Sequence, residues 1–440
     1  MNKIYLSLIA LLANAMAFAQ TPCNNGRYSG NVYSTYTVTS NVAFGSSVAF
    51  SGSTQTLTLD FYEPVADTAA ARPLIIWAHG GSFIGGTKND QDVSELCARF
   101  TKKGYICASI NYRTGFFPFD STGIVPALLR AVQDMKASIR FFYKDRLTTN
   151  TYKVDTNNIF VGGSSAGAIT ALHIAYLDKN CEINPYINAT ALAAAGGIEG
   201  NSGNPNYSSK VHGVINLCGA LGKYGWIENG DVPLCSMHGT SDATVLYGQG
   251  KANPGFPTLY MDGSRMLYAG TTCNGSTNHA FYTWYGAGHV PYAGTSATAI
   301  AYMDTTERFV RDYLLTRLAC TNTPLMTPNT PAGNVSAYAY TNCTTSTLMG
   351  CPVGIKETES NAVLDELYPN PSSDVVTLVF RNPGSEHTLI LTDMTGKIIQ
   401  SDITKEQTYT IHKNNLATGI YFLKAVNARG EYTVKKIMFH

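Results

Sequence analysis

Charged residues are scarce in this 440-residue chain, and their two signs nearly cancel. Asp, Glu, Lys and Arg together make up 14% of the residues, and the formal net charge is +1 at pH 7. A surface that binds nucleic acid carries a clustered basic patch, and the sequence has no basic run. The composition therefore argues against a nucleic-acid partner. Apolar residues make up 44% of the chain, which is enough to bury a sizeable core.

Long apolar runs are also missing after the amino terminus. No later segment reaches the roughly 18 uninterrupted apolar residues that cross a bilayer. The start of the chain combines Lys3, an apolar stretch at 4–15 and an A-x-A pattern at 17–19, which is typical of a secretory signal peptide. We therefore expect residues 1–19 to be a signal peptide, no stable membrane insertion, and a secreted or cell-surface location.

Sequence patterns of metal and phosphate sites are absent as well. The chain has no H-E-x-x-H, no paired C-x-x-C, no acidic calcium loop and no P-loop. We therefore expect neither a metal ion nor a cofactor.

Cysteines are present in an even number, ten, which fits an oxidising compartment. Spacing alone does not fix their pairing. Local proximity suggests three pairs, namely Cys97 with Cys107, Cys273 with Cys320, and Cys343 with Cys351. The alternative is that some of these cysteines are small buried apolar residues without a partner.

Short runs with strand character alternate with helix-like runs between about residues 55 and 318. Residues 73–81 and 104–113 are continuous apolar runs that end in polar or glycine residues, as strands buried on both faces of a parallel sheet do. This alternation predicts a mostly parallel α/β sheet with helices on both faces. We assign this domain to residues 20–325.

The composition changes after Cys320. Residues 326–356 are rich in Thr, Asn, Pro and Gly and are predicted to be a linker. From 357 to 440, short alternating runs are separated by turn residues, which predicts about six or seven strands in a small all-β sandwich.

A G-x-S-x-G motif at 163–167 has Ser165 at its centre. A strand-like run precedes it and a helix-like run follows, as in a nucleophile elbow, where a strained serine projects from a tight strand-to-helix turn. The same turn places the Ala166 amide at a helix N-terminus, where it can stabilise an oxyanion. The alternative is a glycine-rich turn with an N-capping serine.

A serine hydroxyl needs a base to take its proton, and His289 is the best placed of nine histidines. It lies on a glycine-rich loop after a strand-like run, where open α/β sheets build their sites. Asp242 follows another such run and lies between the serine and the histidine in chain order, so it can orient the imidazole. His238 ends an apolar run, where buried histidines are common. The alternatives are an exposed loop histidine and a helix-capping aspartate.

A second glycine-rich stretch at 78–86 follows the strand-like run 73–77. We predict that the backbone amides of Gly81 and Ser82, together with that of Ala166, form an oxyanion hole. His79 would hold this loop by hydrogen bonding. A plain glycine-rich turn is the alternative.

Three aromatic side chains, Phe116, Phe117 and Phe119, lie on a loop that follows the strand-like run 104–113. We predict that they line a cleft for an acyl or aryl group near the catalytic edge of the sheet. They could equally be residues that pack the loop.

Four motifs, HGGSF, GGSSAG, HGTSD and GAGH, occur in this order. Together they resemble the α/β-hydrolase superfamily, particularly its HGG-type carboxylesterases and lipases, over roughly residues 55–318. The resemblance implies that Ser165 is acylated, that His289 acts as general base and then acid, and that Asp242 holds the imidazole.

The resemblance implies a secreted serine carboxylesterase that hydrolyses short-chain or aromatic carboxylic esters, including polymer-attached feruloyl or polyester substrates, through an acyl-enzyme. Two positions depart from the usual motifs: Ser82 in the HGGG run, and Ala168 at the end of GxSAGG. The alternatives are an amidase or peptidase on the same triad and a non-catalytic binding protein on a hydrolase fold.

The carboxyl-terminal region has its own ordered motifs, LYPNPSSDVVTLVF, LTDMTGKII, LATGIYFLKAV and VKKIMF. They resemble the type IX secretion sorting domain of Bacteroidota over about residues 365–440. The resemblance implies that the type IX machinery is a partner, and that this module directs the protein across the outer membrane and is usually removed there. A carbohydrate-binding or adhesive sandwich is the alternative.

Overall fold

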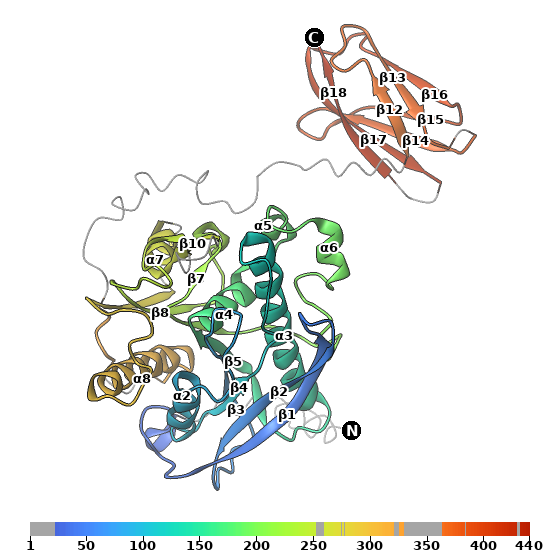
Figure 1. Ribbon diagram of the computed structural model, residues 1–440. Coiled ribbons are helices and arrows are strands. Elements are labelled where there is room, and N and C mark those ends of the chain that lie inside the picture. The colour runs from blue at the N-terminus through green and yellow to red at the C-terminus, as the bar shows by residue number, and fades with distance from the viewer. Residues whose placement is uncertain are drawn as a thin grey trace, which may run out of the picture. The chain divides into compact units, whose positions relative to one another are not determined.

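The computed structural model describes residues 23–251, 259–273, 275–276, 278–320, 325–329, 363–382, 384–428 and 432–440. The chain divides into two compact units, Met1–Pro352 and Val353–His440 (Figure 1). The predicted signal peptide and most of the predicted linker lie outside the described residues. Among the described residues, no helix is both long and apolar enough to cross a membrane.

One eight-stranded sheet forms the centre of the first unit, in the order β1-β2-β4-β3-β5-β6-β8-β11. β2 runs antiparallel to both of its neighbours, and all the other neighbouring strands pair in parallel. The strands are β1 (Tyr36–Val48), β2 (Thr54–Pro64), β3 (Arg72–Ala78), β4 (Ile106–Ile110), β5 (Val154–Ser164), β6 (Gly213–Leu217), β8 (Leu234–Gly239) and β11 (His279–Trp284).

Helices cover both faces of this sheet, because its central strands are apolar on both sides. All seven residues of β3 are buried. Leu74 and Ile76 of this strand belong to one apolar core, which also includes residues of α3 (Ser121–Leu147) and α4 (Ala166–Tyr176). Ile75 and Trp77 belong to a second core, which includes residues of α2 (Gln91–Thr101) and α8 (Ala297–Arg317). This arrangement confirms the predicted mostly parallel α/β architecture.

Several short elements complete the first unit. A small sheet has the strand order β7-β10-β9 and was not predicted from the sequence. The short elements are η1 (Asn24–Gly26), α5 (Asn180–Ile183), α6 (Ala189–Ala194), β7 (Ala220–Leu221), η2 (Tyr224–Trp226), β9 (Gln249–Lys251), β10 (Tyr260–Gly263) and α7 (Ser264–Cys273).

The second unit consists of two antiparallel sheets, one of three strands and one of four, which confirms the predicted small all-β fold. Buried and partly exposed residues alternate along β13 and β14, as expected for sheets with one face toward a shared core. The strands are β12 (Leu364–Tyr368), β13 (Val375–Phe380), β14 (His387–Thr392), β15 (Ile398–Thr404), β16 (Thr408–His412), β17 (Gly419–Asn427) and β18 (Tyr432–Phe439).

The predicted cysteine pairs do not hold where they can be checked. Cys320 pairs with Cys23, across 297 residues and with their Cα atoms 5.6 Å apart, so the predicted bridge from Cys273 to Cys320 is wrong. Cys97 and Cys107 are buried free thiols, on α2 and β4, and serve as small apolar residues. Local spacing misled here because the two ends of the first unit meet in space.

Two more predicted partners have a different status. Cys273, like Cys181, is disulfide-bonded, so it does have a partner other than Cys320. Cys343 and Cys351 lie outside the described residues, and their predicted pairing stays a prediction.

Candidate active site

Ser165 occupies a sharp turn between β5, which ends at Ser164, and α4, which begins at Ala166. Its backbone lies at φ 53° and ψ −118°, a conformation that non-glycine residues rarely adopt. The turn is also crowded. A Cβ atom on Gly167 would lie 2.0 Å from the carbonyl oxygen of Ala78 on β3. Glycine at that position therefore allows the turn that aims the Ser165 hydroxyl away from the sheet.

Ser165, His289 and Asp242 form one hydrogen-bonded chain. Ser165 Oγ lies 2.8 Å from His289 Nε2, and His289 Nδ1 lies 2.7 Å from Asp242 Oδ2. The Asp242 side chain is fully buried, whereas that of His289 is 20% exposed. With Nδ1–H donating to the carboxylate, Nε2 is left to accept the proton of the serine hydroxyl. The three residues come from the carboxyl ends of β5, β8 and β11, as the sequence predicted.

The carboxylate of Asp242 is held by four donors. Its Oδ1 atom accepts the amides of Thr244 and Val245, each at 2.9 Å, and its Oδ2 atom contacts His238 and His289. Burial alone would raise the pKa of Asp242, but the hydrogen bonds from His238 and His289 outweigh it. The pKa of Asp242 therefore lies below its usual value, and the group stays ionised at neutral pH.

His238, which the sequence predicted to be an ordinary buried histidine, is part of the site. Its Nε2 atom lies 3.1 Å from Asp242 Oδ2 and 2.9 Å from the carbonyl oxygen of Val245, and both are acceptors, so Nε2 carries the proton. Its Nδ1 atom lies 2.8 Å from Ser264 Oγ. The i, i+4 spacing of His238 and Asp242 within HGTSD was the available signal.

A second contact joins the serine and histidine loops behind the triad. Ser164 Oγ lies 2.5 Å from the hydroxyl of Tyr292, and both side chains are buried. Asp92 of α2 also hydrogen-bonds Ser164, although burial still raises the pKa of Asp92 above its usual value. Because Ser164 precedes the candidate nucleophile and Tyr292 follows the candidate base by three residues, this cluster fixes the spacing of the two loops. No local pattern in the sequence indicates this contact.

The loop after β3 approaches the nucleophile closely. A Cβ atom on Gly80 would lie 3.4 Å from Ser165 Cβ. Gly81 and Ser82 have φ values of 105° and 54°, and the carbonyl of Gly81 accepts the amides of residues 84 and 85. The Ala166 amide is the first of α4, where amides have no intrahelical partner. The predicted oxyanion donors thus lie on the turn that contains Ser165 and on the loop after β3 that approaches it.

His79 makes its contacts within this loop and with Tyr112 rather than with the triad. Its Nδ1 atom lies 2.7 Å from the carbonyl oxygen of Gly80, and its ring stacks on Tyr112 with centroids 4.3 Å apart. The Tyr112 hydroxyl donates to the carbonyl of His79. Burial lowers the pKa of His79, so the ring is neutral and suited to a structural role.

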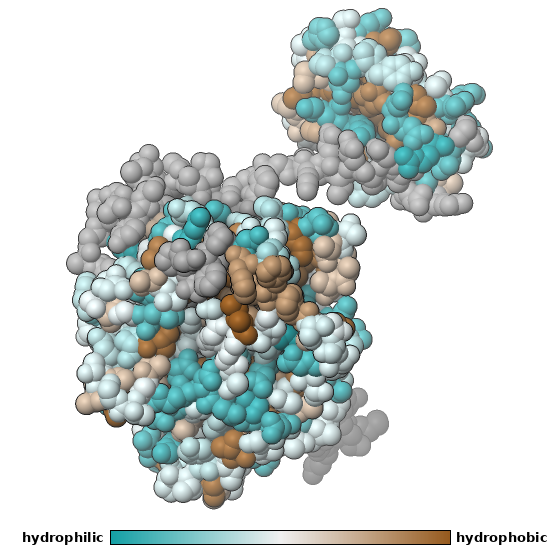
Figure 2. All heavy atoms as spheres, in the orientation of Figure 1, coloured by the Kyte–Doolittle hydropathy of each residue, from teal (hydrophilic) through white to brown (hydrophobic). Residues whose placement is uncertain are grey.

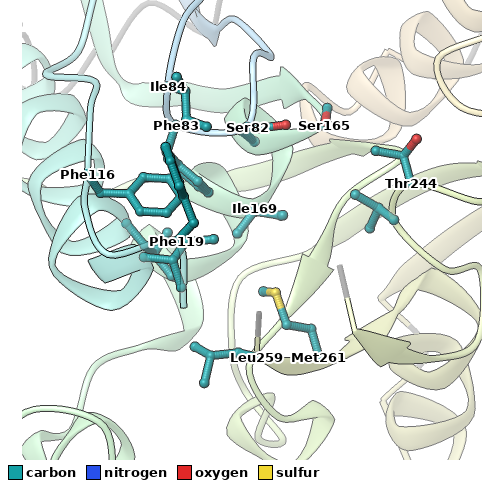
Figure 3. Close-up of a pocket in the computed structure, with 14 residues that line it drawn as sticks. Ser82, Phe83, Ile84, Phe116, Phe119, Ser165, Ile169, Thr244, Leu259 and Met261 are labelled. Atoms are coloured by element: carbon teal, nitrogen blue, oxygen red, sulfur yellow. The ribbon is translucent and has the colours of Figure 1, made fainter. Parts of the chain in front are cut away.

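A cavity opens beside the nucleophile (Figure 3). Phe116 and Phe119 line it, whereas Phe117 does not and is 70% exposed. The bend at 117–120 leaves Phe117 outside the cavity, although its ring still packs edge-on against that of Phe119, with the centroids 5.9 Å apart. The lining residues are Ser82, Phe83, Ile84, Phe116, Phe119, Ile124, Leu128, Ser165, Ala166, Ile169, Thr244, Val245, Leu259 and Met261.

The surface around the first unit is uneven in polarity. On the face drawn in Figure 2, hydrophilic residues dominate its lower half, and hydrophobic residues gather mainly near the upper end of α3. Ile84 and Phe119, which line the cavity, are 47% and 42% exposed. Apolar side chains at the rim favour contact with an apolar ligand.

One group of potential metal ligands among the described residues overlaps the triad. The ligand atoms of Cys218, Asp242 and His289 lie within 4.8 Å of one another. Asp242 and His289 already hydrogen-bond each other, and burial raises the pKa of the Cys218 thiol. Because metals bind the thiolate, this group is better suited to proton transfer than to holding a metal.

Comparisons with known proteins relate two regions of the chain to known families. Residues 59–222 match the family BD-FAE, and residues 366–440 match the secretion system C-terminal sorting domain. Carboxylesterase 3B of Mus musculus is 34% identical over 116 residues, which are 26% of this chain and 19% of that protein. Gut esterase 1 of Caenorhabditis elegans is 29% identical over 113 residues, 26% of this chain and 19% of that protein. The chain thus spans about a fifth of the length of these curated relatives.

Among solved structures, the chain is similar to Thermogutta terrifontis esterase 2 phosphorylated by paraoxon. The TM-score is 0.48 and the sequence identity 18%, over 65% of this chain and 96% of the other. The family matches confirm both resemblances inferred from the motifs: residues 59–222 carry an α/β-hydrolase domain of esterase type, and residues 366–440 carry a type IX sorting domain.

Proposed function

Because residues 59–222 carry an α/β-hydrolase domain of esterase type, we propose that this protein is a serine-dependent carboxylesterase that works through an acyl-enzyme. The observation that carries the proposal is the continuous chain from Ser165 through His289 to Asp242, with contacts of 2.8 and 2.7 Å. This hydrogen-bonded chain lies beside an apolar cavity. The turns that carry the amides of Gly81, Ser82 and Ala166 are close to the nucleophile.

The proposed reaction begins with attack of Ser165 Oγ on the ester carbonyl carbon, while His289 Nε2 takes the hydroxyl proton. The amides of Gly81, Ser82 and Ala166 stabilise the oxyanion of the tetrahedral intermediate. His289 then gives its proton to the leaving alcohol. In the second half, His289 takes a proton from water, the hydroxide attacks the acyl-enzyme, and the proton returns to Ser165 as the acid leaves.

Asp242 has two roles in this scheme. Its hydrogen bond to Nδ1 fixes the tautomer that leaves Nε2 free to act as a base, and its charge stabilises the imidazolium that forms. The lowered pKa of Asp242 suits both roles, since the carboxylate stays ionised when the imidazole gains its proton.

We further propose that the sorting domain directs the enzyme across the outer membrane through the type IX machinery, which places it at the cell surface or outside. The match of residues 366–440 supports this part of the proposal. Removal of the sorting domain from the full-length protein in its host should leave the enzyme inside the cell. Mass spectrometry of exported material tests whether residue 440 is still present after export.

The substitution Ser165→Ala tests the catalytic proposal. Hydrolysis of p-nitrophenyl acetate should fall by about 10⁴-fold or more, because no other hydroxyl contacts His289 Nε2 among the described residues. The circular dichroism spectrum should not change. A variant that keeps its activity would rule out Ser165 as the nucleophile.

Ser164→Ala is the matched neighbour for this experiment. Its hydroxyl bonds Tyr292 rather than His289, so a fluorophosphonate probe should still label this variant but not Ser165→Ala. The same assays address the alternatives. An unlabelled wild-type protein would favour a non-catalytic binding role, and faster turnover of anilides than of esters would favour an amidase.

A further inference from the structure

The cavity beside Ser165 is largely apolar. None of its described lining residues is charged, and its hydroxyl-bearing residues, Ser82, Ser165 and Thr244, lie together at one end. Leu259 and Met261 lie at the opposite end in Figure 3. Among the described residues, the lining therefore changes from hydroxyl-bearing side chains near the nucleophile to apolar side chains at the far end.

The position of the base identifies which half of an ester this cavity would hold. In acyl transfer the base protonates the leaving alcohol, so the alcohol must lie next to His289 Nε2. His289 is not among the lining residues, whereas Ser82 and Ala166 of the predicted oxyanion hole are. The cavity is thus on the acyl side of the scissile bond.

A second apolar cavity continues in the same direction. Leu128, Leu259 and Met261 line both cavities and so form the partition between them. Helix α4 gives the scale: Ile169, one turn after Ser165, lines the first cavity, and His173, one turn further, lines the second. At 1.5 Å per residue these positions lie about 6 and about 12 Å from Ser165 along the helix axis.

We propose that the first cavity binds uncharged aliphatic acyl groups of about four to six carbons, the length that spans about 6 Å of an extended chain, and that Leu128 with its partition neighbours sets this limit. The inference rests on the proposed esterase function and names the substrate class of that site. Leu128 is thereby a specificity-determining residue, and a smaller side chain there would join the second cavity to the first.

The chemistry of the described lining disfavours two other acyl classes. A carboxylate on the acyl group would find no cationic partner among the described lining residues, and burying an unpaired charge is strongly unfavourable. A phenolic hydroxyl on an aromatic acyl group would reach the partition, where Leu128, Leu259 and Met261 offer only hydrocarbon and a thioether. In the second cavity burial lowers the pKa of His173 to about 4, so this region is also neutral at pH 7.

The experiment measures kcat/KM of the full-length protein on p-nitrophenyl acetate, butyrate, hexanoate, octanoate and decanoate. The wild type should peak at butyrate or hexanoate and fall at least tenfold by decanoate. Leu128→Ala should raise the ratio of decanoate to butyrate at least tenfold, since each buried methylene contributes about fourfold. Leu128→Phe should move the optimum to acetate. Leu147→Ala is the matched control, because Leu147 is on the same helix and 74% exposed.

The outcomes separate this inference from the proposed function. Turnover of acetate with no effect of Leu128 substitutions on the chain-length profile would overturn the inference and leave the esterase intact. Loss of all ester turnover in the wild type would overturn the proposed function itself. If Leu128→Ala fails to fold, Leu128→Val and the chain-length profile of the wild type still test the proposed limit. A wild-type optimum at decanoate would contradict the claim that Leu128, Leu259 and Met261 limit the acyl chain.

Discussion

The central strands of the large sheet in the first unit are buried on both faces, whereas the strands β13 and β14 of the second unit are buried on one. All seven residues of β3 are buried, while β13 alternates between buried and partly exposed positions. A sheet covered on both faces needs helical crossovers, and these place long loops at the strand ends. Alternating strands connect through short turns. The difference explains why the candidate catalytic groups all lie in the first unit, on loops after β5, β8 and β11.

Backbone strain follows the same division. Ser82, Ser165, Cys218 and Val290 have positive φ values, and each lies on a loop near the triad. In the described part of the second unit, Asn414 alone among non-glycine residues does so. Such conformations cost about 1–3 kcal/mol each, which the large two-faced core can offset. The second unit has a smaller core and few strained positions.

Asp242→Asn in the first unit should reduce turnover far more than the same kind of substitution in the second unit. An asparagine favours the wrong imidazole tautomer, so we expect kcat to fall by about 10⁴-fold. The measurement is hydrolysis of p-nitrophenyl butyrate at pH 7. The same change at the exposed Asp374 of the second unit should leave turnover within twofold of wild type, and a comparable loss there would break the contrast.

The Asp242 variant should also have a pH signature in stability. Because the folded-state pKa lies below the ordinary value of 3.8, the ionised carboxylate stabilises the fold above about pH 4, and this contribution is lost as pH falls through the folded-state pKa. The difference in unfolding free energy between wild type and Asp242→Asn should therefore shrink between pH 6 and pH 3. If urea titrations give the same difference in unfolding free energy at every pH, the ionised Asp242 does not stabilise the fold in this way.

Replacing both Cys23 and Cys320 by serine should destabilise the first unit alone. The disulfide closes a loop with a sequence separation of 297, and loss of such a bridge costs about 2–5 kcal/mol. Calorimetry should show one thermal transition moving to lower temperature and a second, from residues 353–440, unmoved. A joint shift of both transitions would mean that the units do not unfold independently.

His238→Asn should produce a smaller, more specific loss. Removing one donor to Asp242 Oδ2 leaves a buried acceptor under-satisfied, which costs about 1–3 kcal/mol and lowers kcat about tenfold. The carboxylate would then attract the imidazole proton more strongly, so the acid limb of the kcat/KM profile should move to higher pH. A rate loss with an unmoved pH profile would reduce His238 to a packing role.

Removal of the second unit should have the smallest effect on turnover. A chain that ends at Pro352 retains every described residue of the site, and its kcat/KM on a small soluble ester should stay within twofold of the full-length value. A larger loss would show that the two units share more than a connecting segment.

The sequence predicted the parts of this molecule that depend on local pattern and chain order. The apolar runs at 73–81 and 104–113 became β3 and β4, and Ser165, Asp242 and His289 lie close together because the ends of parallel strands meet at one edge of the sheet. The bridge from Cys23 to Cys320 and the contact of Ser164 with Tyr292 are set by distant segments meeting in space, with no local signature.

Other misses have equally physical reasons. The strands β7, β9 and β10 are two to four residues long, too short for a period of two to show. The role of His238 depends on the turn at 242–245, which brings the Asp242 carboxylate and the Val245 carbonyl to its Nε2 atom. Phe117 lies outside the cavity that Phe116 and Phe119 line, because of the bend at 117–120. The composition of the loop does not show which of its three phenylalanines face the cavity.

The contact between Ser164 and Tyr292 has a consequence for the second half of the proposed reaction. Once Ser165 is esterified, it has no hydroxyl proton and its hydrogen bond to His289 is lost. One contact between the loop of Ser165 and the loop of His289 is then missing. The contact between Ser164 and Tyr292 does not involve the reacting atoms and persists. It holds the loop of His289 in position while Ser165 carries the acyl group, so the imidazole is still in place to take a proton from the incoming water.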